Sequence, residues 1–186
     1  MEGKEALQII SDLRTDQVVV TTMSTSREWP SFSKREELDL PLSGCMGKAS
    51  SLGLGIALGQ PERQVLVLDG EGSLLMNLGS LVTIGALAPA NLVHFILDNG
   101  SYDTSGGQPT PGAGTVNLPG MATAAGYRNG YTFTEAAELR QKLPAILKET
   151  GPTMVSVTVP KGWATTDSPG RKTAQAMKEV AAALAG

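Results

Sequence analysis

Runs of apolar residues without alternating polar positions recur along the chain and predict strands that are buried on both faces. Other segments carry apolar residues at helical spacing and predict helices that cover a sheet. The predicted strands are residues 18–22, 64–69, 91–98, 131–133 and 153–159. The predicted helices are residues 5–13, 47–58, 73–87, 121–125 and 173–184, with a further one opening at residue 134. Because strands and helices alternate, the sequence predicts an α/β fold, a parallel sheet with helices on both faces.

Less regular segments lie between these elements. Residues 24–42 are polar and contain Pro30 and Pro41, so we expect a short helix and a loop there. Thr134 is expected to cap the helix that follows it, and Pro144 to kink or split that helix. Residues 99–117 predict a long loop rich in Gly, Ser, Thr and Pro, and ordered loops of that length are usually functional.

Length and composition indicate one domain, residues 1–186, with a sizeable core. The net charge of −3, without any Lys/Arg run, argues against a nucleic-acid partner. Cys45 is the only cysteine, which indicates a reducing compartment, and no segment has the pattern of a signal peptide or a membrane span. We therefore expect a cytoplasmic protein without membrane contact. The many segments with few charges are also typical of a subunit that buries apolar surface against a partner.

The most informative motif is Gly70-Glu71-Gly72-Ser73, at the end of one apolar strand. Asp98-Asn99 ends the next apolar strand, and Asn99 lies 28 positions after Glu71. A carboxylate and an amide oxygen at neighbouring strand ends can hold a hard divalent cation. The glycines let backbone N–H groups approach phosphate oxygens, and a serine at a helix start suits phosphate. An isolated Gly-x-Gly would only relieve strain in a turn, but the combination predicts a cation–diphosphate site.

At these residues the chain resembles the diphosphate-binding domain of thiamine-diphosphate enzymes, whose signature is Gly-Asp-Gly followed about 27 to 28 residues later by an Asn-ended pair. Within that family it is most similar to the beta subunit of sulfopyruvate decarboxylase and to the C-terminal part of phosphonopyruvate decarboxylase. The resemblance runs from about Thr21 to Trp163. It is carried by Thr21-Thr22, Ser26-Arg27-Glu28, Met46-Gly47, Ala49-Ser50-Ser51, residues 68–79, residues 91–94, residues 97–100 and residues 105–108.

The resemblance implies that this chain binds thiamine diphosphate and Mg²⁺. The metal ion would be held by the Glu71 carboxylate, the Asn99 side chain and the Ser101 carbonyl. The diphosphate would be contacted by the turn glycines, by the serine that follows them and by the end of the first strand, at Gly70, Gly72, Ser73, Asn99 and either Thr22 or Ser24.

The resemblance also implies catalytic and substrate contacts. Met46 would be the apolar wedge that bends the cofactor, and the Gly44 carbonyl would accept a hydrogen bond from its 4′-amino group. The bend brings the 4′-imino nitrogen to the thiazolium C2 proton, which makes an intramolecular base. Arg27 is the candidate partner for an anionic tail on the substrate, although a surface salt bridge is as good an interpretation. Thr104 and Gln108, on the long loop, would face the substrate.

Two features depart from the family pattern. Glu71 replaces the usual Asp, and its extra methylene displaces the carboxylate by roughly 1.5 Å. We expect Mg²⁺ binding to survive, weakened or with Ca²⁺ or Mn²⁺ tolerated. The family also needs a pyrimidine-binding domain with a catalytic Glu, and Glu2, Glu5 and Glu28 are better interpreted as solvated charges. We therefore expect an alpha-type partner subunit that carries this domain, and no activity from this chain alone.

His94 lies inside an apolar strand and is expected to be a core residue.

The resemblance thus implies the diphosphate-binding subunit of a decarboxylase acting on a short 2-oxo acid with an anionic tail. Its first candidate reaction converts 3-sulfopyruvate to sulfoacetaldehyde and CO₂, in coenzyme M synthesis or sulfonate metabolism. Phosphonopyruvate is the alternative substrate, disfavoured by chain length because that enzyme resembles a single chain with both domains. A rival hypothesis is a non-catalytic cofactor-binding or interaction subunit with an altered metal site. A nucleotide-binding α/β domain is weakly supported, since no Gly-x-Gly-x-x-Gly or Walker-type loop follows a strand.

Overall fold

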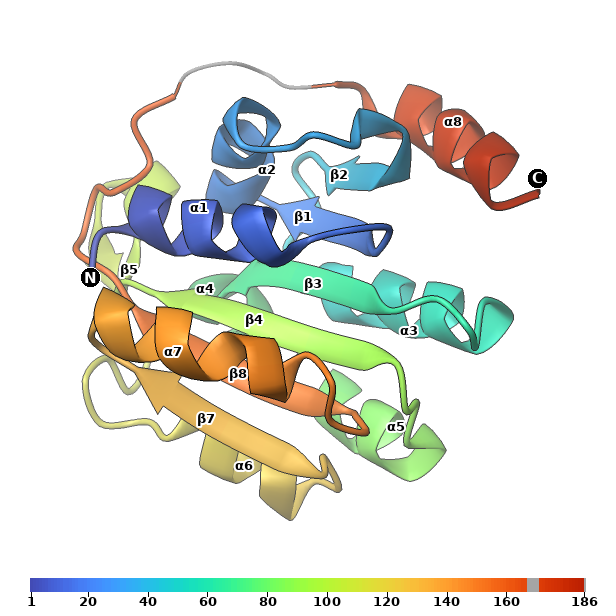
Figure 1. The fold of residues 1–186 in the computed structure, drawn as a ribbon. Helices are drawn as coiled ribbons and strands as arrows, with labels where there is room; N and C mark the ends of the chain where they lie inside the picture. The colour runs from blue at the N-terminus through green and yellow to red at the C-terminus, as the bar shows by residue number, and fades with distance from the viewer. Residues whose placement is uncertain (167–170, 186) are drawn as a thin grey trace.

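A twisted parallel sheet forms the centre of the molecule and has helices packed on both faces (Figure 1). The computed structural model describes residues 1–166 and 171–185. Within these residues the sheet has six strands in the order β2-β1-β3-β4-β8-β7, all parallel. The strands are β1 (Val18–Thr22), β2 (Asp39–Leu42), β3 (Val65–Gly70), β4 (Leu92–Asp98), β7 (Asn129–Phe133) and β8 (Thr153–Thr158). The predicted fold class is confirmed.

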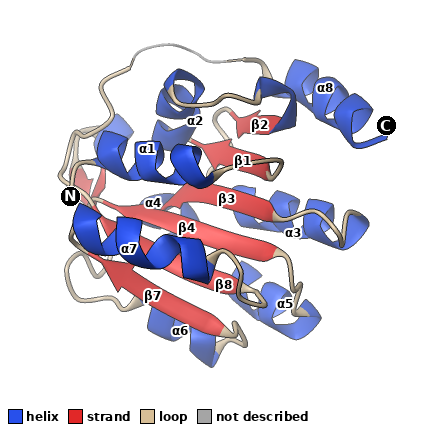
Figure 2. Cartoon of the chain, viewed as in Figure 1, coloured by secondary structure: helices blue, strands red, loops and turns tan. Residues whose placement is uncertain are grey.

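The helices form two layers (Figure 2). On one face lie α1 (Gly3–Leu13) and α7 (Ala136–Ile146), and on the other α3 (Ala49–Gly59), α5 (Ser80–Leu87) and α6 (Leu118–Ala124). The C-terminal helix α8 (Thr173–Ala185) packs against β2. Two short helices, α2 (Ser24–Glu28) and α4 (Glu71–Leu75), follow β1 and β3 directly. In the described part of the chain, no helix combines the length and the apolar character that crossing a bilayer would require.

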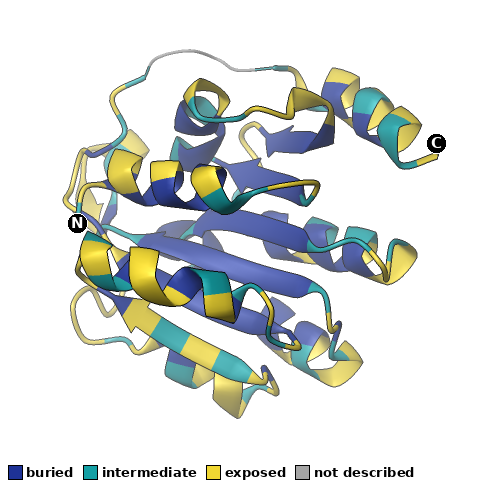
Figure 3. Cartoon of the chain, in the orientation of Figure 1, coloured by how far each residue is buried: buried dark blue, intermediate teal, exposed yellow. Residues whose placement is uncertain are grey.

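Two hydrophobic cores lie on opposite sides of the sheet, which explains the unbroken apolar runs of its central strands (Figure 3). Val65 and Val67 of β3 face the core under α3 and α5, whereas Leu66 and Leu68 face the core under α1 and α7. All four side chains are fully buried. A strand buried on both faces has no polar face to show in its sequence.

The structure corrects the prediction for residues 24–42. The expected short helix is present as α2, but residues 39–42 form strand β2 rather than a loop. Among the described residues this strand pairs with β1 alone, and it is therefore an edge strand. An edge strand tolerates Pro41, because proline has no N–H to give to a neighbour on the open side.

Two helix predictions also need correction. The predicted helix over residues 73–87 is two helices, α4 and α5, separated by turns at residues 76–79. The Asn77 side chain in this break donates a 2.9 Å hydrogen bond to the Gly47 carbonyl. Thr134 is not the cap of α7, whose N-terminal flanking residue is Glu135. Helix α7 runs through Pro144 to Ile146 and is not split there.

The order of the strands marks where a ligand can bind. From β1 the chain moves outward to β2, whereas β3 and β4 extend the sheet in the opposite direction. The loops after β1 and β3 therefore leave toward opposite sides and open a crevice between them. In open α/β sheets ligands bind at such a switch point, beyond the carboxyl ends of the strands.

Candidate functional site

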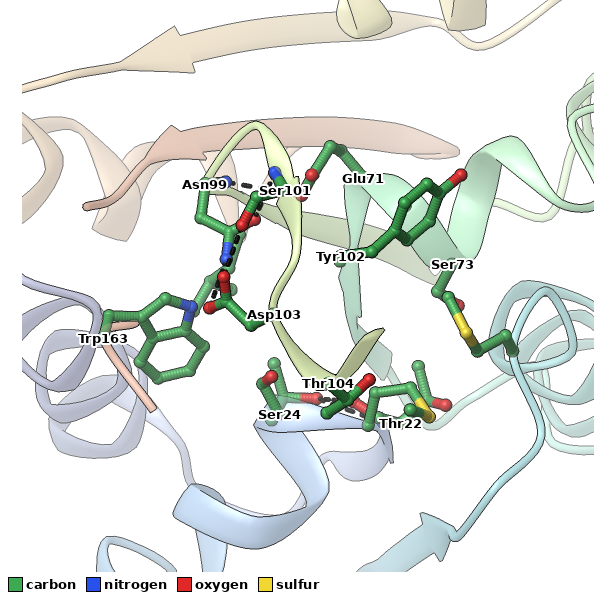
Figure 4. Close-up of a pocket in the computed structure, with 16 residues that line it drawn as sticks. Thr22, Ser24, Glu71, Ser73, Asn99, Ser101, Tyr102, Asp103, Thr104 and Trp163 are labelled. Atoms are coloured by element: carbon green, nitrogen blue, oxygen red, sulfur yellow. Dashed lines mark hydrogen bonds between the residues drawn. The ribbon is translucent and has the colours of Figure 1, made fainter. Parts of the chain in front are cut away.

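A pocket opens at this switch point, where β1, β3 and β4 end (Figure 4). Most of the predicted site residues line it: Thr22, Ser24, Met46, Gly70, Glu71, Gly72, Ser73, Asn99, Ser101 and Thr104. The lining also includes residues that the sequence did not assign, namely Met23, Thr25, Leu97, Tyr102, Asp103 and Trp163. The fold thus brings together segments that are far apart in the chain.

Three predicted residues do not line this pocket. Gly44 is exposed, two residues before Met46, with φ of +70°. Arg27 is half-buried, and its Nη2 lies 3.5 Å from the Ser24 hydroxyl oxygen, so it reaches back toward a residue of the lining. Gln108 is exposed on the short strand β6 (Gln108–Pro109), which pairs with β5 (Ser101–Tyr102). Their roles toward cofactor and substrate remain predictions.

Glu71 is the buried charge of the site. It is the first residue of α4, is 5% exposed, and its Oε2 accepts a 3.3 Å hydrogen bond from the Asn99 backbone N–H. Its Oε1 is buried without a hydrogen-bond partner among the described residues. Burial, together with the negative charge of Asp98, raises the pKa of Glu71 from 4.5 to about 7. The hydrogen bond from Asn99 shows that the Glu71 side chain, one methylene longer than that of Asp, reaches the loop after β4.

Asn99 is held by its own loop. Its Oδ1 accepts a 3.0 Å hydrogen bond from the Ser101 N–H, and its Nδ2 donates a 2.7 Å hydrogen bond to Asp103. Gly100 between them has φ of +66°, which glycine adopts without strain. The amide is thus fixed in one orientation, on the residue whose backbone N–H bonds to Glu71. Asp103 was missed by sequence reasoning, although an acidic residue four positions after the motif Asn was a signal.

Ser73 and Gly72 form the helix start beside Glu71. The Ser73 hydroxyl oxygen accepts a 3.0 Å hydrogen bond from the Gly47 N–H, which leaves its own proton free to donate. This contact fixes the turn after Met46 against α4. At Gly72 a Cβ atom would lie 2.6 and 2.8 Å from atoms of the Tyr102 ring. Glycine is therefore required here because the aromatic ring occupies the space of a side chain.

The turn after β1 contains a strained residue. Met23 has φ of 51° and ψ of −121°, which is uncommon for a residue with a side chain. Its carbonyl accepts hydrogen bonds from the Ser26 N–H at 3.1 Å and the Ser26 hydroxyl at 2.7 Å. The Thr22 hydroxyl donates to the Leu42 carbonyl at 3.3 Å, whereas the Ser24 side chain is half-buried in the lining. Of the two predicted alternatives, Ser24 has the freer hydroxyl.

The segment after β8, residues 160–166, is called the strap here and contributes one residue to the pocket lining. Its Trp163 lines the pocket and packs so closely on Gly3 that a Cβ there would lie 2.3 Å from the ring. Glu28 holds the far end, accepting 2.6 Å hydrogen bonds from the Thr165 and Thr166 N–H groups. The interpretation of Glu28 as a solvated charge is wrong, because it is only 1% exposed.

His94 is a core residue, as predicted. It is fully buried on β4, and its Nδ1 lies 3.3 Å from the hydroxyl of Tyr127, which is also buried. On the other side its Nε2 lies 3.5 Å from Asp69 Oδ2. The Asp69 Oδ1 accepts a 2.8 Å hydrogen bond from the Gly70 N–H, at the start of the motif turn.

The residues around Glu71 fit a hard cation. A buried carboxylate oxygen without a hydrogen-bond partner destabilises the folded protein, and a positively charged ligand would offset that cost. The neighbouring donors are amide, carbonyl and hydroxyl oxygens, which suit Mg²⁺ or Ca²⁺ better than softer metals. Within residues 1–166 and 171–185, no cluster of three His, Cys, Asp or Glu side chains is placed to hold a metal ion. The cation would therefore also need oxygen ligands from a diphosphate or from water.

Known proteins are similar to this chain in sequence. Residues 18–157 match the family described as "Thiamine pyrophosphate enzyme, C-terminal TPP binding domain". The chain is 44% identical to phosphonopyruvate decarboxylase of Streptomyces viridochromogenes, over 83% of this chain and 38% of that one. It is 40% identical to the beta subunit of sulfopyruvate decarboxylase from Methanothermobacter thermautotrophicus, over 77% of this chain and 76% of the relative.

A solved structure has a similar fold. Benzoylformate decarboxylase from Polynucleobacter necessarius superposes with a TM-score of 0.72 at 17% identity, over 87% of this chain and 33% of that one. This chain spans less than two fifths of the phosphonopyruvate decarboxylases that it matches, 38% and 35% of their lengths. The family match and the 40% identity to a relative of similar length lead to one conclusion: the chain belongs to the thiamine pyrophosphate (thiamine diphosphate) enzymes, as their C-terminal cofactor-binding domain.

Proposed function

We propose that this chain is the diphosphate-binding subunit of a thiamine-diphosphate-dependent 2-oxo acid decarboxylase, with 3-sulfopyruvate as its substrate and sulfoacetaldehyde and CO₂ as products. The observation that carries the proposal is the buried Glu71 carboxylate, which has an unpartnered oxygen next to Asn99 in a pocket of this family's fold. By analogy with the beta-subunit relatives, the pathway would be coenzyme M synthesis or sulfonate metabolism.

The metal ion and diphosphate would be held by this chain. Glu71, the Asn99 side chain and the Ser101 carbonyl would hold Mg²⁺, and the Gly72 N–H and the Ser73 hydroxyl would donate to phosphate oxygens. These groups are supported by their place in one pocket lining. A helix start with free N–H groups and a hydroxyl suits an anion, and the metal would neutralise the Glu71 charge that burial disfavours.

The organic part of the cofactor would lie against Met46 and Gly44. Met46 is half-buried in the lining, and the hydrogen bond from Gly47 to Ser73 ties its turn to the diphosphate side. When bound, thiamine diphosphate supplies an electron sink for the pair of electrons released with CO₂. Met46 would fix the cofactor's shape, and the Gly44 carbonyl would accept from its 4′-amino group.

The substrate's anionic tail would be recognised by Arg27, with Thr104 and Gln108 nearby. Arg27 supports this role because its guanidinium reaches Ser24, which lines the pocket. Arginine forms strong paired hydrogen bonds with sulfonate- or phosphonate-like oxyanions. The 44% identity to phosphonopyruvate decarboxylase favours phosphonopyruvate as the second candidate substrate.

A partner subunit is part of the proposal, and the distribution of charge supports it. Helices α3, α5 and α6 on one face contain no Asp, Glu, Lys or Arg, although the chain is 18% charged. Helices α1 and α7 on the other face carry charges of both signs: Lys4, Glu5, Asp12, Glu138, Arg140 and Lys142. Val82 and Leu87 of α5 are exposed, as are Leu58 of α3 and Met76 before α5. Three neighbouring helices without charges and with exposed apolar side chains indicate burial against another chain.

The test uses the complex formed when the full chain is co-expressed with a candidate alpha-type subunit from the same organism. With thiamine diphosphate and Mg²⁺, we expect the complex to release CO₂ from 3-sulfopyruvate faster than from 3-phosphonopyruvate, and this chain alone to release none. Binding of the cofactor is measured in parallel by calorimetry. If the complex binds the cofactor and releases CO₂ from neither acid, the decarboxylase proposal is wrong. If it binds neither cofactor nor metal, the non-catalytic alternative is supported.

A further inference from the structure

Asp103 accepts hydrogen bonds from three groups, two in its own loop and one in the strap. It begins a short 3₁₀ turn, Asp103–Ser105, in the long loop after β4. Its carboxylate accepts from Asn99 Nδ2 at 2.7 Å, from the Gly162 N–H at 2.9 Å and from the Ser101 hydroxyl. Figure 4 shows this carboxylate between Asn99 and Trp163, on the side of Asn99 away from Glu71. Three donors engage most of the lone-pair sites of this carboxylate, which makes it a hydrogen-bonding centre.

The contact with Asn99 decides which way the amide points. With Nδ2 bound to Asp103, Oδ1 is directed to the Ser101 N–H, 3.0 Å away. Rotating the amide by half a turn would set its oxygen against a carboxylate and its NH₂ against an N–H donor. An amide oxygen has two lone pairs, so Oδ1 keeps one for a cation while it accepts from Ser101. A charge-assisted hydrogen bond is roughly twice as strong as a neutral one, so Asp103 is the stronger of the two restraints.

The contact with Gly162 connects the same carboxylate to the strap. Asn99 Nδ2 and the Gly162 N–H both donate to Oδ2 of Asp103. The next residue, Trp163, lines the pocket and is wedged against Gly3. A single carboxylate oxygen therefore joins the loop of the metal ligand to the pocket wall.

We propose that Asp103 is a positioning residue for the metal–diphosphate site: it fixes the Asn99 amide with its oxygen available to the cation and couples that loop to Trp163. The inference rests on the proposed function, because it concerns the same metal ion and diphosphate. Asp103 acts through Asn99 and makes no contact with the cation itself. Groups that orient a metal ligand in this way typically contribute ten- to a hundredfold to metal affinity.

Two substitutions separate orientation from charge. Asp103→Ala removes all three contacts. Asp103→Asn keeps them, because its amide oxygen can accept from Asn99 and Gly162 while its NH₂ donates to the Ser101 hydroxyl, which also accepts. Asp16→Ala is the matched control, since it removes an exposed carboxylate that, among the described residues, pairs with Arg63 and the Thr15 hydroxyl alone.

The Mg²⁺ dissociation constant of each complex is measured by calorimetry at saturating thiamine diphosphate, and the folded state is checked by circular dichroism. We expect Asp103→Ala to weaken Mg²⁺ binding by about ten- to a hundredfold, while Asp103→Asn restores most of the affinity and Asp16→Ala matches the wild type. Trp163 fluorescence gives a second readout. The emission change on cofactor binding should be present in the wild type, absent in Trp163→Phe and reduced in Asp103→Ala.

The proposal is overturned if folded Asp103→Ala binds Mg²⁺ within about twofold of the wild type, or if Asp103→Asn is as weak as Asp103→Ala. If Asp103→Ala does not fold, Asp103→Ser replaces it, because one short hydroxyl cannot replace three contacts, and wild-type affinity in that variant would also overturn the proposal. A wild-type complex that binds Mg²⁺ and cofactor without releasing CO₂ contradicts only the proposed function. A wild-type complex that binds no Mg²⁺ contradicts both.

Discussion

Replacing Glu71 by Gln should make the cofactor-free protein more stable at pH 8 and remove most of the pH dependence of its stability between pH 5 and pH 8. The reason is the buried Glu71 carboxyl, whose pKa burial and Asp98 raise from 4.5 to about 7. Gln has nearly the same shape as the protonated acid and does not ionise. The substitution therefore keeps the packing and removes the charge.

The size of the effect follows from linkage between proton binding and folding. Between pH 4.5 and pH 7 the folded protein keeps a proton on Glu71 that the unfolded chain has released, so stability falls as the pH rises through this window. Each pKa unit corresponds to about 1.4 kcal/mol, so the full loss is about 3.5 kcal/mol, of which roughly 2–3 kcal/mol falls between pH 5 and pH 8. Burial also raises the pKa of Asp98, which adds a slope of the same sign. The comparison with Glu71→Gln isolates the part due to Glu71.

The assay is urea unfolding of the metal-free chain at pH 5, 6, 7 and 8, followed by circular dichroism, with Glu62→Gln as the control for an exposed glutamate. We expect the free energies of unfolding of wild type and Glu71→Gln to be similar at pH 5 and to separate by roughly 2–3 kcal/mol at pH 8, with Glu71→Gln the more stable. Mg²⁺ with thiamine diphosphate should stabilise the wild type and not the variant. A wild-type stability that does not change from pH 5 to pH 8, or a less stable Glu71→Gln at pH 8, would refute the reasoning.

Other substitutions test the packing around the site and the surface of the charge-free helices α3, α5 and α6. Gly72→Ala should cost about 1–3 kcal/mol of stability, measured by thermal unfolding, and weaken cofactor binding, because its Cβ would enter the Tyr102 ring. Gly85→Ala should cost at least as much, since its Cβ would lie 1.9 Å from a backbone oxygen beyond α6, and an unchanged unfolding midpoint would contradict this. Val82→Lys, at a 62% exposed position, should leave stability within about 0.5 kcal/mol but abolish co-purification of the partner subunit, whereas Gln141→Lys on α7 should not.

The central part of the fold and most of the site could be predicted because their signals are local. The buried strands β3 and β4 are continuous apolar runs, and the residues that follow each run are the ones that meet in the pocket. The chain order then places Glu71 and Asn99 at adjacent strand ends, which the 3.3 Å contact between them bears out. The apolar periodicity and one motif were sufficient to predict these two strands and the meeting of Glu71 with Asn99.

The features that could not be predicted depend on partners distant in sequence. The break between α4 and α5 coincides with the hydrogen bond from Asn77 to Gly47. The spacing of apolar residues in a helix does not predict a contact between residues so far apart in the sequence. Glu28 resembles a surface charge until the strap, more than a hundred residues later, supplies Thr165 and Thr166 as donors. Asp103 likewise gains its importance from Gly162. Local patterns carry no information about such contacts.

The place of β8 in the sheet has a consequence for how the chain folds as it is synthesised. Strand β8 lies between β4 and β7, yet it is the last of these three strands to be made, and β7 pairs with no other strand among the described residues. Until residues 153–158 have left the ribosome, β4 keeps an open hydrogen-bonding edge beside the Asn99 loop and β7 has nothing to join. Open apolar edges recruit strands from other chains. A nascent or truncated chain that stops before β8 should therefore be the form that aggregates and depends on chaperones. Once β8 pairs with β4 and β7, the edge of β4 is no longer open.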